Sequence, residues 1–252
     1  MYLNAIERTG GDFSGEDSYL QDIPAIKGLS LLELRQPVTF LVGENGSGKS
    51  TLLDAVALAL GFNPEGGSRN FAFSTRDTHS GLHDYLRLHR GPYRPKDGFF
   101  LRAESFYNTA TEVERLAESG LSSPSNFLQS YGGKSLHHQS HGESFLSLVH
   151  NRFRGEGIYL LDEPEAALSP ARQLTLLAEI HRLVEAGSQL LIATHSPILM
   201  AYPQGEILLL GEEPIHPVGY RETEHYQITK SFLDHPERML RILFQQGEED
   251  TE

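Results

Sequence analysis

The sequence predicts an α/β fold with a mostly parallel sheet flanked by helices. Short apolar runs typical of buried strands alternate with helical patterns along the chain. The runs at residues 158–161 and 190–193 are joined by one helical pattern, which is the arrangement of a βαβ unit. The chain has 252 residues, of which 38% are hydrophobic and 22% charged, so it has the composition of a globular protein.

The elements follow from the spacing of apolar residues. The expected strands lie at residues 38–42, 99–101, 158–161, 190–193 and 207–210. One helix is expected over residues 49–60, where leucines and valines recur on one face and Gly61 follows. A second helix is expected to begin after Ser169 and Pro170 and to end near Gly187.

The chain is expected to form one domain over residues 1–245. Residues 62–98 and 120–141 are rich in Gly, Ser, Asn, Pro and His and are expected to form loops or an inserted subregion and not a separate core, with a small helical or loop insertion at about 105–141. Residues 246–252 are predicted to form a frayed acidic tail.

Composition excludes several classes of site. The chain has no cysteine, which excludes disulfides, thiolate metal sites and a cysteine nucleophile. The net charge of −13 argues against a nucleic-acid surface spread over the whole chain. Because there is no long apolar run and no basic, apolar start, we expect a cytoplasmic protein without a transmembrane segment of its own.

A phosphate-binding loop follows the first expected strand. Residues 43–50 match the pattern G-x-x-x-x-G-K-[ST] and lead directly into a helix, which is the context that the pattern requires. Glycines let backbone N–H groups turn inward as an anion nest, and the helix adds its positive N-terminal end. The predicted phosphate-binding residues are Gly43, Glu44, Asn45, Gly46, Ser47, Gly48, Lys49, Ser50 and Thr51.

Two residues of this loop have specific predicted roles. The ammonium group of Lys49 is suited to the β and γ phosphates of a triphosphate, and the Ser50 hydroxyl is a hard oxygen ligand suited to Mg²⁺.

Acidic side chains follow the apolar run at residues 158–161. A P-loop enzyme needs a carboxylate at the end of a neighbouring strand to hold Mg²⁺, so Asp162 is the predicted metal ligand. Glu163 is the predicted general base for the attacking water. His195, just after the strand at 190–193, is predicted to contact a γ phosphate and to orient water.

These motifs resemble those of an ABC-type ATPase head, the class shared by transporter ATPase subunits, the SMC family and small standalone bacterial ATPases. The Walker A and Walker B motifs resemble residues 43–51 and 158–163, and the D-loop and switch histidine match residues 165–169 and His195. The signature motif in its S-x-G-E form resembles Ser140, Gly142 and Glu143, with His141 between them. The matched motifs cover about residues 38–200, in the order that the family has.

The resemblance implies ATP and Mg²⁺ as ligands and a second copy of the chain as partner. In this family the signature of one subunit contacts the γ phosphate bound by the other, so two ATP molecules lie between two chains. The family's Q-loop glutamine is missing, and Glu104 stands in its place as a candidate metal ligand. Tyr220, His225 and Tyr226 are expected to make core or lid contacts and not to take part in chemistry.

Three functions are open at this point. The first is Mg²⁺-dependent ATP hydrolysis, with Lys49, Glu163 and His195 as catalytic residues. The second is an ATP-gated clamp of a repair or defence type on an unidentified protein or on nucleic acid, which the basic residues of 87–102 would contact. The third is the energy subunit of a transporter. A long coiled coil of the SMC kind is excluded, since only about 90 positions separate Ser50 from Ser140 and they show no sustained heptads.

Overall fold

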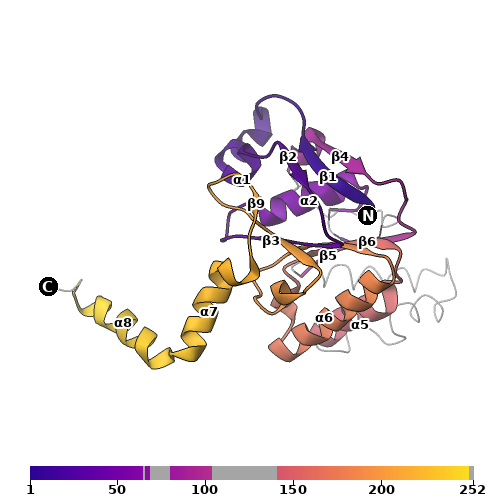
Figure 1. Cartoon of the computed structure of the whole chain (residues 1–252). Coiled ribbons are helices and arrows are strands. Elements are labelled where there is room, and N and C mark those ends of the chain that lie inside the picture. Colours follow the sequence, from indigo (N-terminus) through magenta and orange to yellow (C-terminus); the bar gives the residue numbers. More distant parts are fainter. Residues whose placement is uncertain (65, 69–79, 104–140, 250–252) are drawn as a thin grey trace.

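The computed structural model describes residues 1–64, 66–68, 80–103 and 141–249. Ser140, Glu104, nearly all of the expected insertion at 105–141 and the last three residues lie outside the described residues. Within them, the chain forms two sheets, helices on both faces of the larger sheet, and a pair of helices at the C-terminal end (Figure 1).

The larger sheet confirms the predicted α/β architecture. Its strand order within the described residues is β5-β6-β7-β3-β8-β9, and all neighbours are parallel except β8 and β9. The strands are β3 (Val38–Val42), β5 (Asp97–Arg102), β6 (Gly157–Asp162), β7 (Gln189–Ala193), β8 (Gly205–Leu209) and β9 (His216–Pro217). Five of them correspond to expected strands, with bounds that differ by no more than two residues. These strands are continuous apolar runs in the sequence because both faces of the sheet are covered.

Helices cover the two faces of this sheet. Helix α2 (Lys49–Ala59) lies on one face, while α5 (His141–Arg152) and α6 (Pro170–Glu185) lie on the other (Figure 1). Alternate strand residues serve the two sides: Val38, Phe40 and Val42 join the core beneath α5 and α6, whereas Leu41 joins the core beneath α2.

A smaller antiparallel sheet packs on the α2 side, and the sequence analysis missed it. Its order is β2-β1-β4, with β1 (Leu3–Arg8), β2 (Leu31–Glu33) and β4 (Leu86–Arg90). Residues 86–90, which were expected within a loop or an inserted subregion, instead form a strand of this sheet. Strand β4 has the sequence LRLHR and is partly or fully exposed along its length, so it lacks the continuous apolar run of a central strand.

Short helices complete the body of the molecule. Helix α1 (Pro24–Lys27) follows the first 3-10 helix, η1 (Gly15–Asp22). The remaining 3-10 helices are η2 (Gly81–Tyr85), η4 (Pro164–Ala167), η5 (Leu199–Ala201) and η6 (Tyr220–Glu222).

The last two helices lead away from the body as an arm. They are α7 (Glu224–Asp234) and α8 (Pro236–Glu249), and Figure 1 shows them projecting from the rest of the chain. No residue of α7 is buried. Helix α8 continues through residues 246–249, where an acidic tail was expected. In the part of the chain that the structure describes, no helix is long and apolar enough to cross a membrane.

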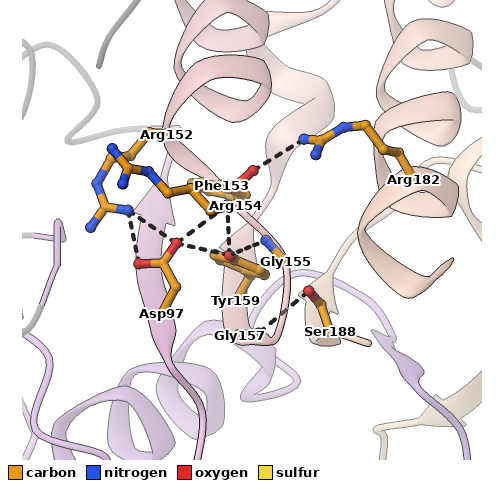
Figure 2. A network of polar contacts seen from close by, with 9 residues as sticks. All are labelled: Asp97, Arg152, Phe153, Arg154, Gly155, Gly157, Tyr159, Arg182 and Ser188. Atoms are coloured by element: carbon orange, nitrogen blue, oxygen red, sulfur yellow. Dashed lines mark hydrogen bonds and ion pairs between the residues drawn. The ribbon is translucent and has the colours of Figure 1, made fainter. Parts of the chain in front are cut away.

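A polar network fastens α5 to the start of β5 and β6 (Figure 2). Arg152, the last residue of α5, donates to both carboxylate oxygens of Asp97 at 2.8 and 3.0 Å, and both side chains are mostly buried. The hydroxyl of Tyr159 donates to the same carboxylate at 2.9 Å and accepts from the backbone N–H groups of Arg154 and Gly155. The network therefore joins the C-terminal end of α5 to two neighbouring strands.

Asp97 is the residue on which this network depends. We expect Asp97→Asn to lower the free energy of unfolding by about 3 kcal/mol, because it leaves a mostly buried guanidinium without its carboxylate. Urea unfolding followed by circular dichroism measures this loss. The matched control is Lys96→Gln, which removes an exposed ion pair with Glu156 and should change stability by no more than about 0.5 kcal/mol.

The difference in unfolding free energy between wild type and Asp97→Asn should depend on pH. Burial opposes ionisation of Asp97, but the hydrogen bonds and charge of Arg152 and the Tyr159 hydroxyl outweigh it and hold the pKa of Asp97 below its usual value of 3.8. The ionised group therefore stabilises the fold above pH 3.8, and this contribution is lost as the pH falls below that value. The stability difference between wild type and Asp97→Asn should shrink in acid; a constant difference would contradict the role of Asp97.

Candidate functional site

The carboxyl ends of the central strands place the candidate residues along one edge of the sheet. Leu41, Ala193, Asp162 and Arg102 are register neighbours across β3, β7, β6 and β5. The chain segments that leave these strands therefore begin at the same level. In open α/β sheets this edge is where ligands bind.

The loop between β3 and α2 has the backbone that its glycines predict. Gly46 and Gly48 have φ values of 82° and 98°, in the left-handed region that glycine adopts at low cost. A Cβ atom on Gly43 would collide with the carbonyl oxygen of Leu210, so a side chain has no room there. Ser47 Oγ is buried and has no hydrogen-bond partner among the described residues. The loop thus offers a tight turn and an unused buried hydroxyl, which fits a phosphate group.

Lys49 lies folded into this loop at the first position of α2. Its Nζ donates to the carbonyl oxygens of Gly43 at 3.0 Å and Glu44 at 2.9 Å, and only 4% of the residue is exposed. Burial lowers the pKa of Lys49, while the nearby carboxylates of Glu163 and Asp162 act in the opposite direction. The structure therefore brings this cation and the two predicted acidic residues into one electrostatic neighbourhood.

The predicted metal ligands lie side by side. The hydroxyl of Ser50, on α2, donates to Oδ1 of Asp162, at the end of β6, over 2.9 Å. Asp162 is 94% buried, and a carboxylate that is buried to this extent needs a positive charge nearby. Two hard oxygen atoms at this distance, next to a phosphate-binding loop, are suited to Mg²⁺. Thr51 follows Ser50 in α2 and is partly buried.

Arg102 is a residue of this site that the sequence analysis assigned elsewhere. Its guanidinium lies 3.1 Å from Oδ2 of Asp54 and 3.7 Å from Oδ2 of Asp162. The sequence analysis placed Arg102 in a possible nucleic-acid patch over residues 87–102. Its place at the end of β5, opposite Asp162, could have been recognised from the predicted register of parallel strands.

The other basic residues of 87–102 do not gather with Arg102. Arg87 and His89 both contact Glu7 on β1, at 3.5 and 2.8 Å. Lys96 pairs with Glu156 at 2.8 Å. The contacts of these basic residues are therefore divided between the small sheet, the turn before β6 and the carboxyl ends of the large sheet's strands.

Glu163 follows Asp162 in an unusual backbone conformation. Its φ and ψ values are 47° and 50°, which a residue with a side chain adopts only at a cost of about 1–2 kcal/mol. The Glu163 carboxylate lies 3.6 Å from Nε2 of His195, and its side chain is 38% exposed. Glu163 is thus partly exposed to solvent, whereas the preceding residue, Asp162, is buried.

Glu165 holds the backbone of His195 in place. Its buried carboxylate accepts from the backbone N–H of His195 at 2.5 Å. Burial raises the pKa of Glu165, while hydrogen bonds from the His195 N–H and the Thr194 hydroxyl partly offset it. The sequence places Glu165 in the D-loop but does not predict its contact with His195, because one short segment does not show which residues are its neighbours across the sheet edge.

The ring of His195 is held on its other side by His225. Nδ1 of His195 and Nε2 of His225, from the second residue of α7, are 2.9 Å apart. Burial and then the charge of Lys49 lower the pKa of His195, against the opposing effect of Glu163. The expected lid or core contact of His225 is therefore a direct contact with the predicted γ-phosphate residue.

The described residues of the signature motif, Gly142 and Glu143, contact η4 and α6 of the same chain. Gly142 and Glu143 lie in the first turn of α5. Oε1 of Glu143 pairs with Arg172 of α6 at 3.0 Å. A Cβ atom on Gly142 would lie 2.8 Å from the carbonyl oxygen of Ala167 in η4, so glycine permits this close packing. Within one chain, the start of α5 thus packs against the segment that follows Glu163.

Family models match two parts of the chain. A model described as an AAA domain matches residues 19–117. A second, described as an AAA domain, putative AbiEii toxin, Type IV TA system, matches residues 136–201. Together they include the phosphate-binding loop, Asp162, Glu163 and His195.

Curated relatives include ATP-binding proteins. The cobalt import ATP-binding protein CbiO of Salmonella typhi is 29% identical in an alignment 235 residues long that covers 84% of this chain and 84% of that protein. A putative ABC transporter ATP-binding protein of Caldanaerobacter subterraneus subsp. tengcongensis is 27% identical in an alignment 219 residues long that covers 77% of this chain and 84% of that protein.

Solved structures show the same fold. A putative metal-chelate type ABC transporter in an inward-facing conformation aligns with a TM-score of 0.53 and 18% identity, over 91% of this chain and 88% of that chain. An ATP-binding cassette of an ABC transporter aligns with a TM-score of 0.51 and 16% identity, over 88% of this chain and 93% of that chain.

Proposed function

We propose that this chain, which is an ATP-hydrolysing P-loop ATPase of the ABC type, hydrolyses ATP with Mg²⁺ between two copies of itself. The observation that carries the proposal is the contact of Ser50 with Asp162 beside Lys49, at the sheet edge that also carries Glu163 and His195. This set contains a phosphate-binding cation, a pair of hard oxygen ligands, a carboxylate base and an imidazole.

The loop residues bind the triphosphate. The buried hydroxyl of Ser47 and the ammonium group of Lys49 supply hydrogen-bond donors, and the glycines keep side chains out of the turn. Lys49 exchanges its hydrogen bonds to the backbone carbonyls for phosphate oxygens. Burial lowers the pKa of Lys49, and the negative charge of a bound polyanion would act in the opposite direction, as the nearby carboxylates do.

Ser50 and Asp162 hold the metal ion. When bound, Mg²⁺ neutralises phosphate charge and orients the phosphates for attack. The Arg102 guanidinium lies 3.7 Å from the other carboxylate oxygen of Asp162, where its positive charge faces this buried group.

Glu163 activates the attacking water. A general base has to lie within hydrogen-bond reach of the proton that it takes, and the carboxylate of Glu163 is partly exposed beside His195, where water can approach it. His195 lies 3.6 Å from that carboxylate and donates to the γ phosphate. Glu165 fixes the backbone of His195, so the imidazole is presented from a rigid position.

The signature residues complete the site from a partner chain. Within one chain, Gly142 and Glu143 contact η4 and α6. We infer a dimer in which the start of α5 of each copy, which Ser140 precedes in the sequence, covers the nucleotide of the other. In such a dimer, the start of α5 of one copy covers the partner's nucleotide, while its Gly142 packs against Ala167 of the same chain. Because Ala167 lies in the segment next to that chain's own catalytic residues, this packing would connect the two nucleotide sites.

The similarity to CbiO favours a second candidate, the energy subunit of a transporter. Such a subunit would act with a membrane partner, and the same ATP-driven closure of two chains would supply the work. Co-purification with a membrane protein in detergent would favour this candidate over a standalone ATPase.

Glu163→Gln tests the proposed base. The variant should reduce Mg²⁺-dependent ATP turnover by at least about 100-fold, because the amide cannot take a proton from water. Phosphate release at saturating ATP measures this change. The control is Glu156→Gln, which alters an exposed glutamate paired with Lys96 and should leave turnover unchanged. Equal turnover by wild type and Glu163→Gln would exclude Glu163 as the base.

The same variant tests the dimer. With ATP and Mg²⁺, Glu163→Gln should show twice the 28.1-kDa chain mass by size exclusion with light scattering, since bound ATP is not consumed. Adding Lys49→Ala to this variant should return the mass to that of one chain, because the triphosphate loses its buried cation. A single-chain mass for Glu163→Gln at saturating ATP would argue against the sandwiched dimer.

A further inference from the structure

The contact between His195 and His225 has a chemical consequence. Nδ1 of His195 and Nε2 of His225 are 2.9 Å apart, a hydrogen-bond distance. Burial lowers the pKa of both rings, as does the charge of Lys49. Two neutral imidazoles can share this contact only if one donates and the other accepts.

The surroundings of His195 select the donor. Nε2 of His195 is buried and faces the carboxylate of Glu163 at 3.6 Å. If this nitrogen carried no proton, its lone pair would face a carboxylate, which is unfavourable. A proton on Nε2 instead faces the anion, and Nδ1 of His195 must then accept from His225.

The rest of His225 agrees with this direction. Once Nε2 of His225 carries the proton, Nδ1 is an acceptor, and this buried Nδ1 has no hydrogen-bond partner among the described residues. Either arrangement leaves one buried N–H without a hydrogen-bond partner among the described residues, at His195 Nε2 or at His225 Nδ1. The arrangement with the proton on Nε2 of His195 is favoured because that N–H faces the Glu163 carboxylate at 3.6 Å.

The start of α7 is fixed well enough to position His225. Thr223 is 99% buried, donates to the carbonyl oxygen of Tyr220 at 2.8 Å and accepts from the backbone N–H of Tyr226. The rings of Tyr220 and Tyr226 also pack together, with centroids 4.7 Å apart. His225 lies inside this anchored turn.

Beyond that turn, the arm leaves the body. A groove of about 270 Å³ separates Pro197 and Ile198, just after His195, from Tyr226, Thr229 and Leu233 of α7. No residue of α7 is buried, and the arm projects outward (Figure 1). The anchored first turn of α7, and not tight packing along the helix, therefore brings the arm to the nucleotide-binding edge.

We propose that His225 is a positioning residue that donates a hydrogen bond from Nε2 to Nδ1 of His195, and so keeps the Nε2–H of His195 directed at the γ phosphate. The proposal rests on the proposed function, because it assigns His195 to the phosphate. His225 itself touches neither phosphate nor water. It sets the tautomer and orientation of the ring that does, as the hydrogen-bonded partner of a metal-bound histidine does in other sites.

Kinetics of His225 variants test this role. His225→Ala should lower kcat for ATP by about 10-fold or more and leave KM within about twofold, since supporting contacts of this kind are worth about 10- to 100-fold. His225→Gln should retain more than about a third of the wild-type kcat, because its amide NH₂ replaces the ring Nε2–H as donor. The control is His235→Ala, an exposed histidine between α7 and α8, which should match wild type.

A spectroscopic readout separates this inference from the proposed function. Long-range ¹H–¹⁵N correlation spectra of the histidine rings, assigned with His195→Gln, should show His195 protonated on Nε2 in wild type and in His225→Gln, and a mixture of tautomers in His225→Ala. This measurement does not depend on turnover. Wild-type protein without ATPase activity would contradict the proposed function alone. An unchanged His195 tautomer in His225→Ala, or equal kcat for His225→Ala and His235→Ala, would overturn the role of His225.

Discussion

The arrangement of the site depends on the parallel register of four strands. Leu41, Ala193, Asp162 and Arg102 lie in one row, so the loop after β3, the acidic turn after β6 and the histidine after β7 all leave the sheet at one level. The backbone continues this row, since Glu163 and Thr194 donate to the carbonyl oxygens of Ala193 and Leu41. Ser50 can reach Asp162 over 2.9 Å, past the end of β7, only because this register holds.

The opposite ends of two of these strands, β5 and β6, are joined by the Asp97 network. Asp97 and Gly157 are neighbours in β5 and β6, and the Asp97 network ties them to the last residue of α5 (Figure 2). The first turn of α5 carries Gly142 and Glu143, which pack against η4 and α6. One helix thus connects the stabilising network to the segment proposed to cover a partner's nucleotide. A weakened Asp97 network would loosen this connection as well as the fold.

Local patterns predicted the central fold and most of the described site, because each of those features lies within one short segment. The phosphate loop follows a buried strand directly, and Asp162, Glu163 and His195 each follow an apolar run. The missed features combine distant segments. Strand β4 is polar and pairs with β1, which lies at the start of the chain and far from β4 in the sequence. His225 lies 30 positions from His195, and no periodicity indicates that the start of α7 returns to β7.

Manganese binding tests the proposed metal site at the end of β6 most directly. Mn²⁺ replaces Mg²⁺ at such oxygen sites and is followed by electron paramagnetic resonance. With saturating ATP, wild type should bind about one Mn²⁺ per chain, and Glu163→Gln should bind it equally. Asp162→Asn should weaken Mn²⁺ binding by about tenfold or more, since a charged oxygen ligand is lost. Equal ATP-dependent Mn²⁺ affinity in wild type and Asp162→Asn would contradict the assignment of Asp162 as a metal ligand at the carboxyl end of β6.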